Sequence, residues 1–186
     1  MNPFLITLLA GSIGISLIED LKHQKIPNAV TFPTMALAVG YHSLSSGLSG
    51  FSFSAGGLGL AIALFIVPYL LGGMGAGDVK LMGAAGAILG PKGICIVSIL
   101  ALLSGGVYGM ILFAMSPKYT ASLLRRLWAT VKTFVLTRQL ILIPRSMNEE
   151  HPVLRYAVPI AMGAFGYVFM KITGYDPLYE MLVGKP

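Results

Sequence analysis

The chain has 186 residues, of which 55% are hydrophobic and only 11% are charged, with a net charge of +6 and a mean hydropathy of +0.80. A soluble core of this size cannot bury so many apolar side chains, so the composition excludes a soluble enzyme and indicates a polytopic helical membrane protein. The single cysteine, Cys95, excludes an intramolecular disulfide bond and a multi-cysteine zinc site.

Six apolar segments predict an all-α fold with about six transmembrane helices, in one membrane-embedded domain over residues 1–186. They cover about residues 4–18, 29–44, 58–71, 79–89, 94–115 and 153–172. The first has no cleavage site ahead of its acids and is expected to stay as an anchor. The fourth is short for a hydrocarbon core that needs about 20 helical residues, so we expect it to start inside the membrane or to tilt little. We expect Pro33, Pro68 and Pro159 to interrupt their helices.

The basic residues indicate how the chain is oriented. The connection at residues 45–54 has no charge, whereas the basic residues gather in the first, third and fifth connections: Lys22, Lys25, Lys80, Lys118, Arg125, Arg126, Lys132, Arg138 and Arg145. By the positive-inside rule these connections are cytoplasmic and the N-terminus faces outward, which predicts a multi-pass membrane protein with its acids at the cytoplasmic face. Because the charges follow topology, we expect contact with lipid headgroups and no nucleic-acid binding.

The fifth connection, at about residues 116–152, is long and basic. Its cations recur at near-helical spacing among apolar residues, with Trp128 between them. This pattern predicts an amphipathic helix that lies in the headgroup region as an anchor, although it is also compatible with guiding a substrate.

Two acidic sites stand at the ends of apolar segments. Glu19 and Asp20 close the first segment, and Asp78 follows the glycine cluster at residues 72–77 and opens the fourth. An ionised Asp near hydrocarbon costs roughly 2.5–3.5 kcal/mol, so its presence there needs a reason. The predicted topology brings all three acids to the cytoplasmic face, where two distant carboxylates can meet.

Two carboxyl groups that share one proton can perform aspartic proteolysis. The ionised acid removes a proton from water and the protonated acid polarises the scissile carbonyl, without a covalent intermediate. No serine-hydrolase or zinc-protease motif occurs, and His23, His42 and His151 have no ligand spacing, so we expect neither a metal nor a cofactor.

The residues around the acids leave several interpretations open. Gly75 and Gly77 permit unusual backbone angles and leave room for an extended substrate, or they simply form a turn. Lys80 follows Asp78 by two residues and is either a charge neighbour of the acid or a topology charge. Glu19 and Asp20 point about 100° apart on a helix, and spacing alone does not decide which of them faces Asp78.

Two motifs in order resemble the type IV prepilin peptidase family of intramembrane aspartic proteases. The first is Asp20 followed by a short basic turn and Ile26-Pro27-Asn28, and the second is Gly75-Ala76-Gly77-Asp78 with Lys80 behind it. The likeness covers about residues 5–115, and residues 156–161 are similar to the family's final helix. It implies that Asp20 and Asp78 are the catalytic pair, with Gly75, Gly77, Lys80, Pro27 and Asn28 as motif support.

The resemblance also implies the substrate, a prepilin or pseudopilin whose short basic leader stays in the cytoplasm and is removed by cleavage after a glycine at its end. With one cysteine and no preceding cytoplasmic region, the chain is similar to the short Flp or Tad-type branch, which implies no methyltransferase activity. Two other hypotheses use the same acids: an ion or proton carrier, and a non-catalytic pilus assembly factor in which the acids join helices. The sequence does not indicate the oligomeric state.

Overall fold

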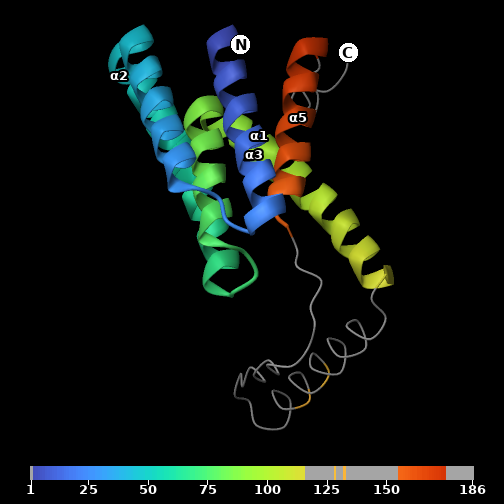
Figure 1. The fold of residues 1–186 in the computed structure, drawn as a ribbon. Helices are drawn as coiled ribbons and strands as arrows, with labels where there is room; N and C mark the ends of the chain where they lie inside the picture. Colours follow the sequence, from blue (N-terminus) through green and yellow to red (C-terminus); the bar gives the residue numbers. More distant parts are fainter. Residues whose placement is uncertain (1, 116–127, 129–131, 133–154, 175–186) are drawn as a thin grey trace. The chain divides into compact units, whose positions relative to one another are not determined.

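The computed structural model describes residues 2–115, 128, 132 and 155–174. They form α1 (Pro3–His23), α2 (Asn28–Leu70), α3 (Ala76–Met115) and α5 (Ala157–Thr173), as Figure 1 shows. These described ranges contain no β-strand, so the all-α prediction is confirmed. α1, α2 and residues 76–112 of α3 are long and apolar enough to cross a membrane, and the chain is a membrane protein.

Both long helices are broken in the middle. α2 loses helical dihedral angles at Ser46 and Gly47, and α3 loses them at Gly90. Gly47 has φ 59° and Gly90 has φ 70°, left-handed values that favour glycine. Figure 1 shows that the chain turns back at each break, so that the two halves of each helix run in opposite directions. Six apolar helical segments therefore follow one another, while the number that cross the bilayer stays a prediction.

The positions of these breaks correct the sequence interpretation. The predicted connection at residues 45–54 is helical except at Ser46 and Gly47. The prediction that Pro33, Pro68 and Pro159 interrupt their helices was wrong. Pro33 and Pro68 lie inside α2 at positions with helical dihedral angles, and Pro159 lies in the first turn of α5, where its missing N–H would have no partner within the helix.

Side chains of α2 donate hydrogen bonds to the last carbonyls of the first half of α3. Ser54 Oγ donates to the carbonyl of Ala87 at 2.7 Å, and His42 Nε2 lies 3.1 Å from the carbonyl of Ile88, for which it is the donor. These carbonyls would otherwise lack partners ahead of the break at Gly90. Because hydrocarbon offers no hydrogen bonds, such partners allow a helix to end among other helices in a membrane.

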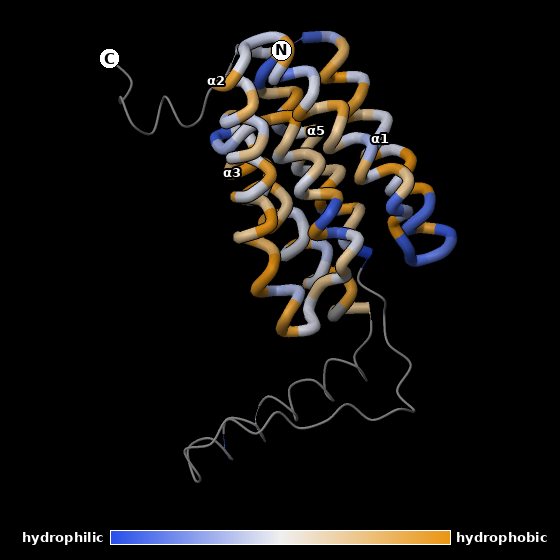
Figure 2. The backbone as a smooth tube through the Cα atoms, turned by 90° about the vertical axis from the view of Figure 1, so that its left-hand side faces the viewer, coloured by the Kyte–Doolittle hydropathy of each residue, from blue (hydrophilic) through white to orange (hydrophobic). Residues whose placement is uncertain are grey.

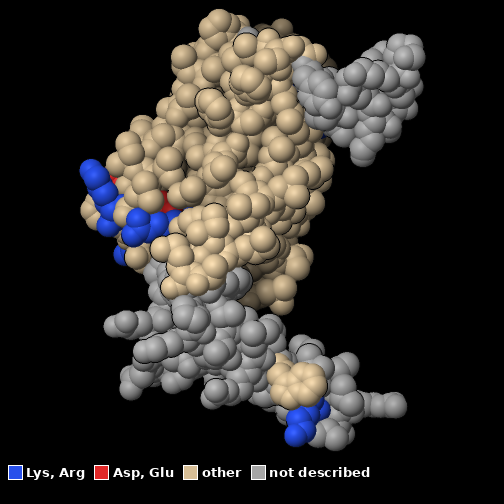
Figure 3. All heavy atoms as spheres, turned by 90° about the vertical axis from the view of Figure 1, so that its right-hand side faces the viewer, with Lys and Arg blue, Asp and Glu red and all other residues tan. Residues whose placement is uncertain are grey.

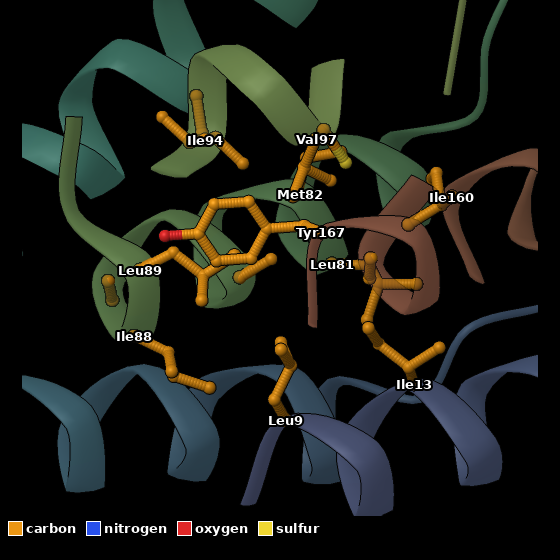
Figure 4. Packing of buried hydrophobic residues seen from close by; sticks show 14 of the residues in the cluster. Leu9, Ile13, Leu81, Met82, Ile88, Leu89, Ile94, Val97, Ile160 and Tyr167 are labelled. Atoms are coloured by element: carbon orange, nitrogen blue, oxygen red, sulfur yellow. The ribbon is translucent and has the colours of Figure 1, made fainter. Parts of the chain in front are cut away.

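The first half of α3 forms the centre of the bundle. Every residue from 81 to 90 is buried, and Figure 4 shows Leu81, Met82 and Ile88 in one buried cluster with Leu9 of α1 and Ile160 of α5. Backbones approach closely here, since a Cβ on Gly86 would collide with the carbonyl of Gly57. The short fourth segment is thus surrounded by protein, which relaxes the length that lipid would demand of it.

The outside of the bundle is apolar. Large hydrophobic side chains such as Leu44, Leu70 and Phe165 are more than two-thirds exposed. Figure 2 shows apolar residues along the helices and hydrophilic residues concentrated near their ends. A bilayer solvates such a surface, whereas water does not.

The chain divides into two compact units, Met1–Gly105 with Arg155–Pro186, and Gly106–Leu154. The predicted site lies wholly in the first. In the second, the structure describes residues 106–115 and the helical positions Trp128 and Lys132. The predicted interfacial helix and the basic connection at 116–152 otherwise lie outside the described residues. That residues 1–186 form a single peptidase domain stays a prediction.

Candidate active site

Asp20 lies in the last turn of α1 and is 9% exposed. The helix ends because Gln24 takes a left-handed conformation, with φ 54°, and its N–H donates to the carbonyl of Asp20 at 3.0 Å. The carboxylate accepts a hydrogen bond from the backbone N–H of Ala157, at the start of α5, and lies in the field of Arg155. Its Oδ2 is buried and has no hydrogen-bond partner among the described residues.

Asp78 lies in the first turn of α3 and is 8% exposed. Its Oδ2 accepts a hydrogen bond from the backbone N–H of Gly75 at 3.2 Å, which suits an acid at a helix N-terminus. Its Oδ1 is buried and has no partner within the described part of the chain. Each acid therefore has one oxygen held by backbone or charge and one oxygen left for another group.

One pocket of about 780 Å³ contains both acids. All seven residues that the motifs single out line it, and the full lining is Glu19, Asp20, His23, Gln24, Lys25, Ile26, Pro27, Asn28, Gly75, Ala76, Gly77, Asp78 and Lys80. Figure 3 shows Lys and Arg side chains beside acidic atoms at one end of the first unit, whose remaining described surface on that face carries no charge. The fold thus brings the two motifs to one polar site.

The two motif glycines, Gly75 and Gly77, allow neighbouring atoms to approach the backbone closely, and neither has a strained backbone conformation. A Cβ on Gly77 would lie 2.9 Å from the Cβ of Ile26, and a Cβ on Gly75 would lie 3.0 Å from Asp78 Oδ2. Neither glycine has a positive φ; in this turn only Gly72 does. Gly75 and Gly77 therefore do not use the left-handed backbone angles that glycine permits, and close packing of Gly77 against the first motif is the reason for its lack of a side chain.

Lys80 joins the motifs. Its Nζ donates a hydrogen bond to Asn28 Oδ1 at 2.9 Å and lies 5.3 Å from the centre of the Phe32 ring, within the range of a cation–π contact. Lys22, its counterpart two residues after Asp20, is exposed and does not line the pocket. The parallel spacing of the two lysines is thus not matched by parallel contacts.

Glu19 and Asp20 differ in their surroundings. Glu19 Oε2 lies 2.9 Å from His23 Nδ1, and its side chain is 37% exposed. Asp20 is buried against the start of α5. The structure therefore places the carboxylate of Asp20, and not that of Glu19, in a buried setting like that of Asp78.

Sequence reasoning missed the contribution of the last helix. Neither Arg155 nor Ala157 was assigned to the site from the sequence. α1 packs against α5, which brings the helix N-terminus and the guanidinium to Asp20. The available signal was a basic residue directly ahead of the last apolar segment, but nothing local tells which earlier helix it meets.

Residues 6–110 match the model of the type IV leader peptidase family. This chain belongs to the type IV leader peptidase family. Membership makes it a protease and implies prepilins in general as substrates. The matched range holds both acids and the whole lining of the pocket, while Arg155 and α5 lie beyond it. Neither a curated protein nor a solved structure matches the chain.

In a leader peptidase, the two carboxylates of this pocket are suited to acid–base chemistry. Two buried carboxylates, each with one oxygen that has no hydrogen-bond partner among the described residues, border a cavity large enough for water and a peptide segment. Such a pair can take a proton from water and donate a proton to a carbonyl in the same site.

Proposed function

We propose that this leader peptidase is an intramembrane aspartic endopeptidase with Asp20 and Asp78 as its catalytic pair. The observation that carries the proposal is the presence of two buried acids in one pocket, each with a carboxylate oxygen that no described residue hydrogen-bonds. Polar atoms buried without partners are costly, so their persistence favours a role in which substrate or water completes the site.

In the proposed reaction the pair holds one proton. The ionised carboxylate takes a proton from water while the water oxygen bonds to the scissile carbonyl carbon, and the protonated carboxyl donates its hydrogen bond to the carbonyl oxygen. The tetrahedral intermediate then collapses as the C–N bond breaks and the leaving nitrogen takes a proton from the pair. The Gly75 N–H holds Asp78, and the Ala157 N–H with Arg155 holds Asp20 during these steps.

The proposed substrate is a prepilin or pseudopilin, cut at the end of its short basic leader at the cytoplasmic face of the inner membrane. Support comes from the family and from the charge pattern, which predicts that the end of the bundle with the acids faces the cytoplasm. We further propose that the chain is of the Flp or Tad type and does not methylate its product.

Processing of a co-expressed prepilin tests this function. Asp20→Asn and Asp78→Asn should each lower leader removal by at least about 100-fold, since positioned acids and bases contribute roughly 10²–10⁴-fold. The variant Glu19→Gln is the matched control and should retain most activity, because Glu19 is partly exposed and paired with His23. Normal processing by either Asp variant would contradict the mechanism, and Asp78-dependent ion flux in liposomes without cleavage would favour a carrier.

A further inference from the structure

A second, apolar groove of about 460 Å³ opens beside the acid pocket. Its walls come from both halves of α2 and from the start of α3, and the residues that line it are Phe32, Met35, Ile62, Ile66, Tyr69, Ala76, Val79 and Lys80. Its size lies in the range of ligand pockets, roughly 300–1,000 Å³. The proposed reaction of the two acids does not involve this groove.

The groove borders the acid pocket. Ala76 and Lys80 line both cavities. The ammonium of Lys80 is turned to Asn28 in the polar pocket, while the same group lies over the Phe32 ring of the groove. Lys80 therefore marks the border between the polar pocket with the acids and the apolar groove.

The groove runs away from the charged end of the bundle. Along the second half of α2 its lining passes from Tyr69 through Ile66 to Ile62, seven residues or about 10 Å of helix. Along the first half of α2 it passes from Phe32 to Met35. Gly83 lies beneath, where a Cβ would be 3.1 Å from Met35 Cε, so the glycine leaves room for the methionine to lie flat against α3.

We propose that this groove binds the apolar segment of the substrate that directly follows the scissile bond. A peptide that reaches acids at the ends of membrane helices carries an apolar stretch on the membrane side, because a polar stretch would not enter hydrocarbon. The groove provides an apolar binding surface for that stretch next to the acids. This inference rests on the proposed function and adds to it the surface that positions the substrate beside Asp78.

The test uses two membrane-anchored reporters, each with a short basic leader ending in glycine and followed by an apolar helix. One reporter has leucine at the first four positions after the glycine, and the other has alanine there. The full-length enzyme is compared with Ile62→Trp, which fills the groove, and with the control Leu102→Trp. Leu102 is 68% exposed and lines neither cavity.

Ile62→Trp should lower cleavage of the leucine reporter at least tenfold and that of the alanine reporter less than twofold, while Leu102→Trp should change neither by more than twofold. Unchanged cleavage of both reporters by Ile62→Trp, or an equal loss for both, would overturn the inference. If the wild-type enzyme cuts neither reporter, the proposed function itself fails. If it cuts them in an Asp78-dependent way, the proposed function stands, and the effect of Ile62→Trp on the two reporters then tests the groove alone.

Photo-crosslinking gives a measurement that does not depend on how well Ile62→Trp folds. A benzoylphenylalanine placed in the first turn after the glycine of the leucine reporter should label Met35 in the Asp78→Asn enzyme, which retains uncut substrate. Labelling of lipid alone, as expected if acyl chains occupy the groove, or labelling confined to other helices would overturn the inference.

Discussion

Lys80 Nζ donates a 2.9 Å hydrogen bond to Asn28 Oδ1, across 52 positions of the sequence. Lys80 follows Asp78 in the first turns of α3. Asn28 is the first residue of α2, directly after the turn that connects it to α1 and Asp20. The bond therefore ties together the two segments that carry the acids. It accounts for a lysine and an asparagine at the site without assigning either a chemical step.

If this bond positions the acids, breaking it should slow cleavage. Lys80→Met and Asn28→Ala should each lower leader processing about tenfold, because a hydrogen bond to a charged group contributes roughly 1.5–3 kcal/mol. The double variant should be little worse than either single one, since both remove the same interaction. Processing rates in matched membranes provide the measurement.

Lys92→Met is the control for that experiment. Lys92 is exposed on α3 and does not line the pocket, so its loss should leave the rate unchanged. Fully additive losses from Lys80→Met and Asn28→Ala would contradict a shared positioning role.

A single added methyl group should disturb the site at Gly77. In Gly77→Ala the new Cβ would meet the Cβ of Ile26 at 2.9 Å, so the turn before Pro27 and the start of α3 must move apart. We expect processing to fall at least tenfold with the protein still present in the membrane. Gly59→Ala is matched to it, because no atom lies within 4 Å of that Cβ; equal activity of the two variants would argue against close packing of the motifs.

The close contact of α2 and α3 predicts that a substitution far from the acids lowers the stability of the protein. Gly86→Ala places a Cβ against the carbonyl of Gly57, and we expect a loss of about 1–3 kcal/mol from overpacking, seen as a lower melting temperature in detergent. Gly40→Ala, with no atom within 4 Å of its Cβ, should not lower it. An unchanged melting temperature for Gly86→Ala would show that the backbones separate readily.

Cysteine labelling tests the predicted orientation. Cys95 is the only cysteine, so Cys95→Ser provides a background for His23→Cys, with a side chain 65% exposed, and Leu44→Cys, which is 91% exposed. In intact cells a membrane-impermeant maleimide should label Leu44→Cys, and it should label His23→Cys only after permeabilisation. The opposite pattern would place the acids on the outer side and remove the cytoplasmic leader as substrate.

Much about this protein follows from local sequence. Six apolar segments predict a membrane protein, and this prediction is confirmed, because hydropathy acts on each segment by itself. Acids at the ends of two of these segments predict that an acid of the first segment meets Asp78 at one face. The structure places Asp20 and Asp78 in one pocket, while the side of the membrane on which they lie stays a prediction.

Tertiary structure decided what depends on partners distant in the chain. The contact of Gly77 with Ile26, the bond from Lys80 to Asn28, the burial of Asp20 beneath the start of α5 and the groove at Phe32 and Ile62 all join different helices. Between membrane helices no hydrophobic effect selects neighbours, so pairing is set by close packing and hydrogen bonds across the bundle. Those interactions leave only weak traces in the sequence, as glycines and small polar residues whose partners cannot be inferred from spacing.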